Sequence, residues 1–128
     1  MVLDSSAVVA IVLKEAGYQD LLARIEAAPG VAIGAATLVE ILIVLTARLR
    51  GEALLVLKEL LLAAEAEVIP FSEDHSWAAL GAYLRFGKGR HRAALNFGDC
   101  LSYATASVAG QPLLYVGDDF SRTDIQAA

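Results

Sequence analysis

Short apolar runs alternate with helix-length segments along the whole of this chain. The predicted strands cover residues 2–3, 31–34, 67–70 and 113–116. Strands this short, without a clean polar and apolar alternation, are typical of a parallel sheet that is covered by helices on both faces. The sequence therefore predicts a three-layer α/β/α sandwich with a short, mainly parallel sheet, and the 128 residues are enough for one domain.

Polar residues mark where the helices between these strands begin. One helix is predicted to follow Ser5 or Ser6 and to end near Lys14. Further helices are predicted at 19–28, 37–50 and 52–64, and two more run from Ser72 to residue 86 and from Asn96 to about residue 109. The residues suited to cap their N-termini are Ser5 or Ser6, Thr37, Ser72 and Asn96. Thr37 and Glu40 also match the spacing of a capping box, in which the glutamate reaches back to the capping residue.

Composition limits where such a chain can act. Hydrophobic residues make up 57% of it, yet no apolar run reaches the ~18 residues that a membrane span needs. The N-terminus lacks the features of a secretory signal. A single cysteine, Cys100, allows no internal disulfide and fits a reducing cytoplasm. We therefore expect a cytoplasmic protein without a membrane anchor, and we expect the lone Trp77 in its core.

Acidic side chains fall at the ends of strands and the starts of helices. Asp4 follows the first strand, Asp118 and Asp119 follow the last, and Glu40 and Asp99 lie in the first turns of predicted helices. In a parallel sheet these positions share one edge, where ligands bind. Crowded carboxylates raise one another's pKa unless a cation is bound. Oxygen ligands suit Mg²⁺ or Mn²⁺ rather than zinc, so the pattern indicates a metal-dependent phosphoryl-transfer site.

Each acid also has a structural explanation when it is considered alone. Glu40 completes the capping box, Asp99 complements the dipole of its helix, and the Asp118–Asp119 pair resembles an ordinary turn. Asp4 is harder to explain, because Ser5 or Ser6 can cap the following helix without it. Ser6 is itself close enough in sequence to support Asp4 through a hydroxyl hydrogen bond. The joint placement of the acids favours the metal site.

A basic segment precedes the Asp99 helix. Residues 85–92 contain several cations and no acid, although the net charge of the chain is −5. That negative charge excludes nucleic-acid binding by bulk electrostatic attraction, but a local basic patch can still contact phosphates. Taken alone, the segment is more simply explained as a solvated loop; if it does contact phosphates, Lys88, Arg90 and Arg92 are the candidates.

Taken together, these segments resemble the VapC-type toxins of the PIN-domain ribonucleases. The resemblance covers residues 1–10, 37–40, 87–104 and 111–125, with their order and spacing in agreement. It implies Mg²⁺-dependent endonuclease action on RNA, with Asp4 and Asp99 as the main metal ligands. Glu40 and Asp119 would complete the pocket. The family pattern Gly-x-Asp-Phe places the fourth acid at Asp119, and Asp118 is the alternative.

The resemblance also implies partners. Two predicted helices, 37–50 and 52–64, are apolar nearly all round, which a small domain cannot bury completely. A homodimer face and a groove for an amphipathic helix of a VapB-type antitoxin would cover them. Two other functions remain open from the residues: a Mg²⁺-dependent phosphatase or phosphoacceptor domain, and a non-catalytic interaction module whose acids only cap helices.

Overall fold

A four-stranded parallel sheet forms the centre of the protein. The computed structural model describes residues 1–48 and 51–128. Its strands are β1 (Val2–Leu3), β2 (Ala32–Gly34), β3 (Glu67–Ile69) and β4 (Leu113–Leu114), in the order β3-β2-β1-β4. Every neighbouring pair is parallel, which confirms the predicted α/β fold class.

The strand order creates a switch point beside β1. The chain runs from β1 outward to β2 and β3, and then crosses to β4 on the other side of β1. Val2 and Leu3 pair with Ala32 and Ile33 of β2, and with Leu113 and Leu114 of β4. In such sheets ligands bind beyond the carboxyl ends of the strands at the switch point. The residue that follows β1 is Asp4.

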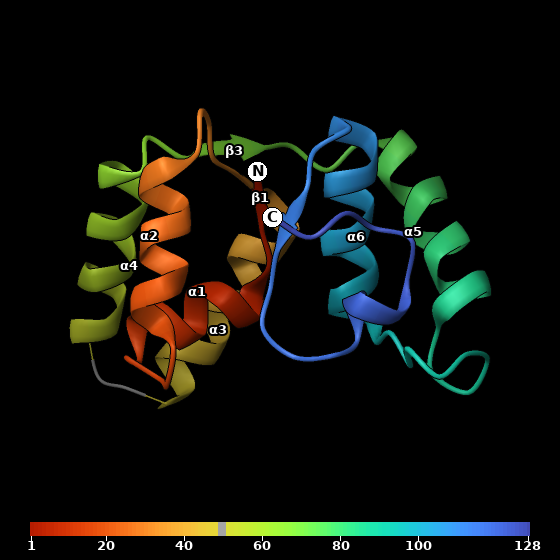
Figure 1. The fold of residues 1–128 in the computed structure, drawn as a ribbon, viewed down its shortest axis with the longest axis horizontal. Coiled ribbons are helices and arrows are strands. Elements are labelled where there is room, and N and C mark those ends of the chain that lie inside the picture. The colour runs from red at the N-terminus through yellow and green to blue at the C-terminus, as the bar shows by residue number, and fades with distance from the viewer. Residues whose placement is uncertain (49–50) are drawn as a thin grey trace.

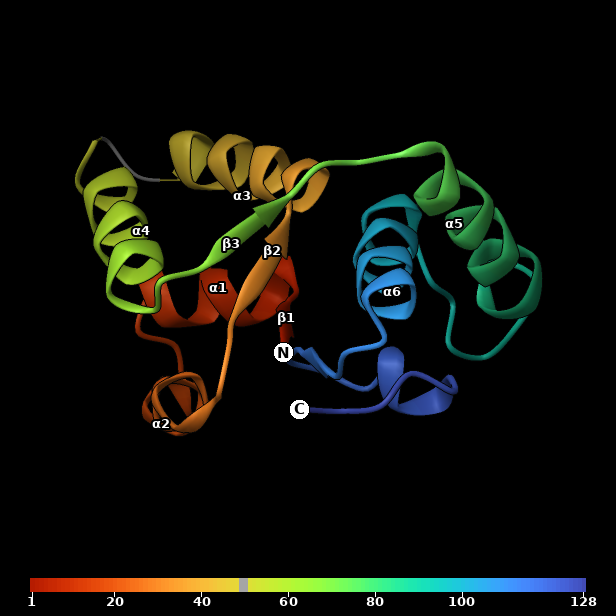
Figure 2. The same cartoon turned by 90° about the horizontal axis from the view of Figure 1, so that it is seen from above.

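Helices cover the two faces of the sheet (Figures 1 and 2). One side carries α1 (Ser5–Val12), α2 (Tyr18–Ala27), α3 (Ala35–Arg48) and α4 (Glu52–Ala63), and the other carries α5 (Glu73–Phe86) and α6 (Phe97–Ala109). A short 3-10 helix, η1 (Phe120–Arg122), follows β4. Figure 2 shows the sheet between the two groups of helices, so the predicted three-layer arrangement is confirmed.

The alternation of side chains along the strands divides the interior into two cores. Leu3 and Leu114 contribute to the core formed with α1 to α4, whereas Val2 and Leu113 contribute to the core formed with α5 and α6. All four side chains are buried. Because successive residues of a strand point to opposite faces, even a two-residue strand contributes to both cores.

Two helix starts differ from the prediction. Asp4 caps α1, because its side chain accepts a hydrogen bond from the Ser6 backbone, so the predicted cap at Ser5 or Ser6 is wrong. Helix α3 begins at Ala35. Thr37 therefore lies inside the helix, where its buried hydroxyl is 3.2 Å from the Ser102 hydroxyl of α6. The predicted capping box of Thr37 and Glu40 is wrong, because a contact between helices occupies the threonine.

Other boundaries are closer to the prediction. Ser72 and Asn96 cap α5 and α6, each within a capping box. Strand β4 ends at Leu114 rather than at residue 116, and the predicted end of α3 at Arg50 lies outside the described residues. The sheet is less completely covered than expected, since two of the three residues of β3 are exposed. Trp77 is also 65% exposed, so its predicted core position is wrong.

In residues 1–48 and 51–128, no helix is both long and apolar enough to cross a membrane.

Candidate active site

Asp4 lies directly beyond the carboxyl end of β1. Its backbone N–H donates to the carbonyl of Leu114 at 2.9 Å, which holds it at the switch point beside β4. The residue is only 2% exposed. Its Oδ2 atom accepts hydrogen bonds from the backbone N–H of Ser6 at 2.9 Å and from the Ser6 hydroxyl at 2.5 Å.

The second oxygen of Asp4 has no such support. Oδ1 is buried and finds no hydrogen-bond partner among the described residues. An unpaired buried carboxylate oxygen is costly, and native structures rarely leave one without a reason such as an ion or water. The geometry therefore leaves Oδ1 as an open ligand position.

Glu40 approaches this position from α3. A Cβ atom placed on Gly98 would lie 2.7 Å from its Oε2 atom, so the carboxylate rests against the first turn of α6. Burial raises the pKa of Glu40 above its usual value, and the charges of Asp4 and Asp99 raise it further, while the Ser5 side chain lowers it. The side chain thus shares one electrostatic site with Asp4 and Asp99.

Asp99 occupies the first turn of α6. Its Oδ2 atom accepts from the backbone N–H of Asn96 at 2.9 Å, and Oδ1 of Asn96 accepts from the Asp99 backbone at the same distance. The predicted cap at Asn96 is therefore confirmed, and Asp99 completes a capping box with it. Burial raises the pKa of Asp99 to about 6, the Asn96 backbone opposes the rise, and the charges of Asp4 and Asp119 add to it. One side chain thus both caps a helix and joins the acidic cluster.

The two aspartates after β4 are not equivalent. Both are exposed, but it is Asp119 whose charge contributes to the raised pKa of Asp99. The backbone carbonyl of Asp118 accepts from the Ser121 hydroxyl at 2.6 Å, within the turn that leads into η1. The electrostatic coupling thus favours Asp119 over Asp118 as the acid that faces the cluster.

The acids suit a hydrated ion better than a fully enclosed one. Among the described residues, no three His, Cys, Asp or Glu side chains form a ready-made metal site. Mg²⁺ keeps several waters and is commonly held by one or two carboxylates. An open buried oxygen on Asp4 and oxygen-only donors with raised pKa values match that requirement. Zinc sites instead take three or four direct protein ligands.

The basic loop leads into the same helix terminus. Lys88, Arg90 and Arg92 are all exposed, as predicted. The loop is closed by a hydrogen bond from the Lys88 backbone to the carbonyl of Leu95 at 2.9 Å, and the Arg90 guanidinium lies over the Tyr83 ring at 5.1 Å. Figure 1 shows this loop, between α5 and α6, at the same end of the molecule as the carboxyl end of β1.

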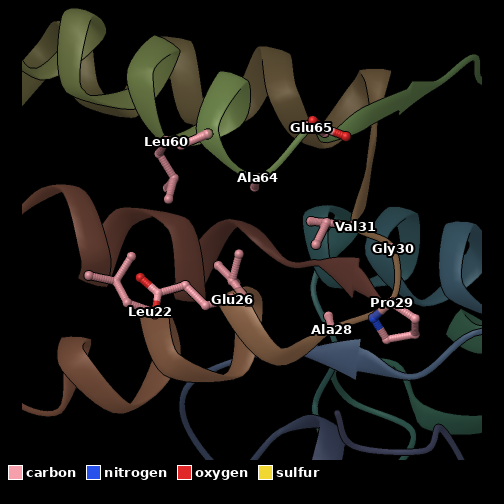
Figure 3. Close-up of a pocket in the computed structure, with 11 residues that line it drawn as sticks. Leu22, Glu26, Ala28, Pro29, Gly30, Val31, Leu60, Ala64 and Glu65 are labelled. Atoms are coloured by element: carbon pink, nitrogen blue, oxygen red, sulfur yellow. The ribbon is translucent and has the colours of Figure 1, made fainter.

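A separate cavity lies at the opposite edge of the sheet. Its volume is about 330 Å³, and it is formed by α2, by residues before β2 and by the end of α4. Figure 3 shows Leu22 and Leu60 facing each other across it, with Glu26 and Glu65 at its sides. Gly30 precedes β2 and Glu65 precedes β3, so the cavity lies at the amino ends of these strands. Asp4, Glu40 and Asp99 lie at the opposite, carboxyl end of the sheet.

Two contacts of the site were missed by reasoning from the sequence. One is the hydrogen bond from the Val116 backbone to the Ser6 hydroxyl at 3.0 Å, and no local pattern points to it. The other is the approach of Glu40 to Gly98. A glycine in the first turn of a helix is unfavourable by propensity, and this was a signal that close approach required the position to be small.

The comparison with known protein families is consistent with this geometry. Residues 1–126 match the PIN domain. Ribonuclease VapC36 of Mycobacterium tuberculosis is 46% identical over 127 residues, which cover 98% of this chain and 91% of that protein. Ribonuclease VapC of Mycolicibacterium smegmatis is 41% identical over 127 residues, covering 99% of this chain and 98% of the relative.

Solved structures share the fold at lower identity. The Mycobacterium tuberculosis toxin VapC20, described as cleaving the sarcin-ricin loop, superposes with a TM-score of 0.78 at 18% identity, over 99% of this chain and 97% of its own. A toxin–antitoxin complex from Klebsiella pneumoniae gives a TM-score of 0.71 at 17% identity, over 96% and 92%. These two likenesses concern the fold alone.

Proposed function

The chain belongs to the PIN-domain family, and we propose that it is a Mg²⁺-dependent endoribonuclease, the VapC-type toxin of a toxin–antitoxin pair. The observation that carries the proposal is the buried Oδ1 atom of Asp4, which has no hydrogen-bond partner in residues 1–48 and 51–128 and lies at the switch point of the sheet, beside Glu40 and Asp99. The ribonuclease relatives, similar over nearly the whole chain, support the RNA substrate. Residues 1–128 act in this proposal as one domain in the cytoplasm.

The residues divide the work of holding the ion. Asp4 and Asp99 are proposed as its main ligands, with Glu40 and Asp119 acting directly or through water. When bound, a divalent cation lowers the pKa of a coordinated water and offsets the charge that develops on a phosphodiester. Ser6 holds Oδ2 of Asp4, and the Asn96 cap holds Oδ2 of Asp99. Each main ligand thus has one oxygen fixed by the protein. Mn²⁺ is expected to substitute for Mg²⁺.

The basic loop is proposed to hold the RNA backbone. Lys88, Arg90 and Arg92 are exposed and lead into the helix that carries Asp99. Cations at these positions can bind phosphates without reading bases, so specificity must come from RNA shape or from splayed bases. Their role is binding rather than chemistry.

An antitoxin is proposed to cover the outer face of α3 and α4. Exposed apolar residues there include Val39, Ile43, Leu55 and Leu62, and a groove of about 390 Å³ lies between the two helices. A groove of this kind suits the apolar face of an amphipathic helix. The surplus apolar surface predicted from these helices is thus present, and the antitoxin is the occupant we propose.

The sequence placed the homodimer face on the helices 37–50 and 52–64, but the exposed apolar side chains of α5 lead us to propose it instead through the outer face of α5. Trp77, Leu80 and Leu84 follow one another at spacings that share a helix face, and all three are exposed. Phe97, at the start of α6, is 81% exposed. A self-complementary contact between two copies would cover these side chains.

The two alternatives from the residues are less well supported. A phosphatase or phosphoacceptor domain needs a second acid close to Asp4 in sequence, whereas Ser5 and Ser6 stand there. A simple interaction module gives no reason for the open buried oxygen of Asp4. Family membership favours the nuclease over both.

Cleavage of total RNA tests the proposal. Wild-type protein and Asp4→Asn are incubated with RNA in Mg²⁺, with and without a chelator, and the new 5′ ends are mapped. Cleavage at defined positions by wild type alone, abolished by the chelator, is expected. The proposal would be contradicted if the variant gave the same products as wild type. It would also be contradicted if folded wild-type protein gave no products in either Mg²⁺ or Mn²⁺.

A further inference from the structure

The second residue of α6, Gly98, lies directly against the carboxylate of Glu40. A Cβ atom built on Gly98 would be 2.7 Å from Oε2, 2.8 Å from Oε1 and 3.0 Å from Cδ of Glu40. The two separations from oxygen are shorter than real Cβ atoms essentially ever show, so an added methyl group and the present carboxylate cannot occupy their positions together.

The backbone does not explain why this residue is a glycine. Gly98 lies in a regular helix, and its φ is not in the left-handed region that favours glycine. Alanine is the better helix former at such a position. Space for a neighbour, rather than conformational freedom, is therefore what the glycine provides.

The neighbour belongs to the acidic site. Glu40 comes from α3, and it reaches across to the turn of α6 that carries Asp99. At this place the positive end of the α6 dipole favours a carboxylate, while the charges of Asp4 and Asp99 oppose it. Because Gly98 has no methyl group, the Glu40 carboxylate can lie close to the helix terminus without a steric clash.

We infer that Gly98 is a positioning residue, which sets where the Glu40 carboxylate stands relative to Asp4 and Asp99. The inference rests on the metal-dependent function proposed above. Because the atoms that a methyl group would meet belong to the end of a flexible side chain, Gly98→Ala displaces the carboxylate and leaves the fold in place. The variant should lose metal affinity without losing stability.

The experiment measures the rise in melting temperature as Mn²⁺ is titrated. A cation that binds the folded state must stabilise it by mass action. Gly98→Ala should melt at or above the wild-type temperature without metal, but need about tenfold more Mn²⁺ for the same rise, a loss typical of disturbed metal surroundings. The matched control is Gly81→Ala in α5, where an added Cβ meets no atom of the described part of the chain within 4 Å. Its Mn²⁺ response should equal that of wild type.

A second substitution tests whether the effect passes through Glu40. Glu40→Asp shortens the side chain by one methylene and should weaken Mn²⁺ binding alone. Combined with Gly98→Ala it should cost less than the sum of the two single changes, because the shorter carboxylate no longer meets the methyl group. Strict additivity would overturn the inference.

The outcomes separate this inference from the proposed function. Wild-type protein without any Mn²⁺ response contradicts the metal-dependent function itself. Wild-type and Gly81→Ala proteins that respond, together with a Gly98→Ala protein that responds equally, overturn the positioning role alone. A Gly98→Ala protein that melts well below wild type and is not restored by Glu40→Asp also overturns it, because the methyl group would then meet the backbone instead.

Discussion

The hydroxyl of Ser6 donates a hydrogen bond to Oδ2 of Asp4 over 2.5 Å. The same hydroxyl oxygen accepts from the backbone N–H of Val116 over 3.0 Å. Ser6 therefore joins the first acid to the segment that follows β4 and leads to Asp119. It also occupies one carboxylate oxygen of Asp4, so that the other remains open toward the acidic cluster.

Replacing Ser6 with alanine should lower activity more than stability. The loss of both hydroxyl contacts is expected to cost about 1 kcal/mol in the free energy of unfolding. The freed Asp4 carboxylate should reduce kcat with little change in KM, because RNA binding is assigned to other residues. Single-turnover cleavage and urea unfolding measure the two effects. Ser107→Ala, at an exposed position of α6, is the control, and equal behaviour of the two variants would contradict the role of Ser6.

Asp99→Asn should abolish RNA cleavage and leave the fold intact. The asparagine can keep the cap on α6, while one charge leaves the crowded cluster. Removing that repulsion and burial cost should leave stability unchanged or raise it by roughly 1 kcal/mol, after allowance for solvent screening. Chemical unfolding without metal and RNA cleavage with Mg²⁺ give the two readouts. If Asp99→Asn unfolds and Mg²⁺ does not change the stability of wild type, then Asp99 has a structural role only.

Asp99 should contribute a loss of stability to the metal-free protein as the pH rises from 3.8 to about 6. Folding raises the pKa of Asp99 from 3.8 to about 6, so in this window the folded state binds more protons than the unfolded state. Stability then falls with rising pH, because the slope follows the difference in bound protons between the unfolded and folded states. The raised pKa of Glu40 acts in the same direction.

Unfolding of wild type and Asp99→Asn at a series of pH values isolates this effect. The stability of wild type relative to Asp99→Asn should fall across this pH window and level off above it. Saturating Mn²⁺ should reverse the wild-type trend, since the cation competes with the proton for the same carboxylates. A difference that stays constant with pH would show that Asp99 keeps its ordinary pKa.

Local signals in the sequence were sufficient for some parts of the fold and site. Asn96 caps α6 and Asp99 lies in its first turn, so the prediction of this helix start needed only neighbouring residues and no tertiary information. The meeting of Asp4, Glu40 and Asp99 followed from topology, because parallel strands bring their carboxyl ends to one edge. These features depend on short stretches of chain or on a general rule for parallel sheets.

Other features depend on how the helices pack. Thr37 matched a capping box but lies within α3, since its hydroxyl meets Ser102 of α6. Trp77 was expected inside because large aromatic residues are usually buried, but α5 has only one side against α6. The space that Gly98 leaves for Glu40 depends on the distance between α3 and α6, which no local pattern encodes.

The basic loop should affect RNA affinity and its dependence on salt. In an inactive Asp4→Asn background, Arg90→Ala with Arg92→Ala should weaken binding and reduce the slope of log Kd against log salt by about 1 to 2, because fewer counterions are released. Arg48→Ala with Lys58→Ala removes the same charge at exposed positions of α3 and α4 and should leave the slope unchanged. Equal slopes for both double variants would remove the loop from the RNA-binding surface.

The two proposed partner surfaces should respond to different substitutions. Trp77→Ser on α5 should weaken the homodimer by about 2 kcal/mol, or roughly thirtyfold in Kd, because buried aromatic residues dominate such interfaces. It should leave antitoxin binding unchanged. Ile43→Ser on α3 should do the reverse. Both residues are 65% exposed in the single chain, so neither change should unfold it.

Sedimentation at micromolar concentration measures the dimer, and co-purification with a co-expressed VapB-type antitoxin measures the antitoxin complex. The two variants serve as controls for each other, since they remove similar apolar area from opposite sides of the sheet. If Trp77→Ser and Ile43→Ser weaken the same complex equally, one surface serves both partners. If wild type is monomeric and neither variant changes either measurement, both proposed contacts, through α3 and through α5, are wrong.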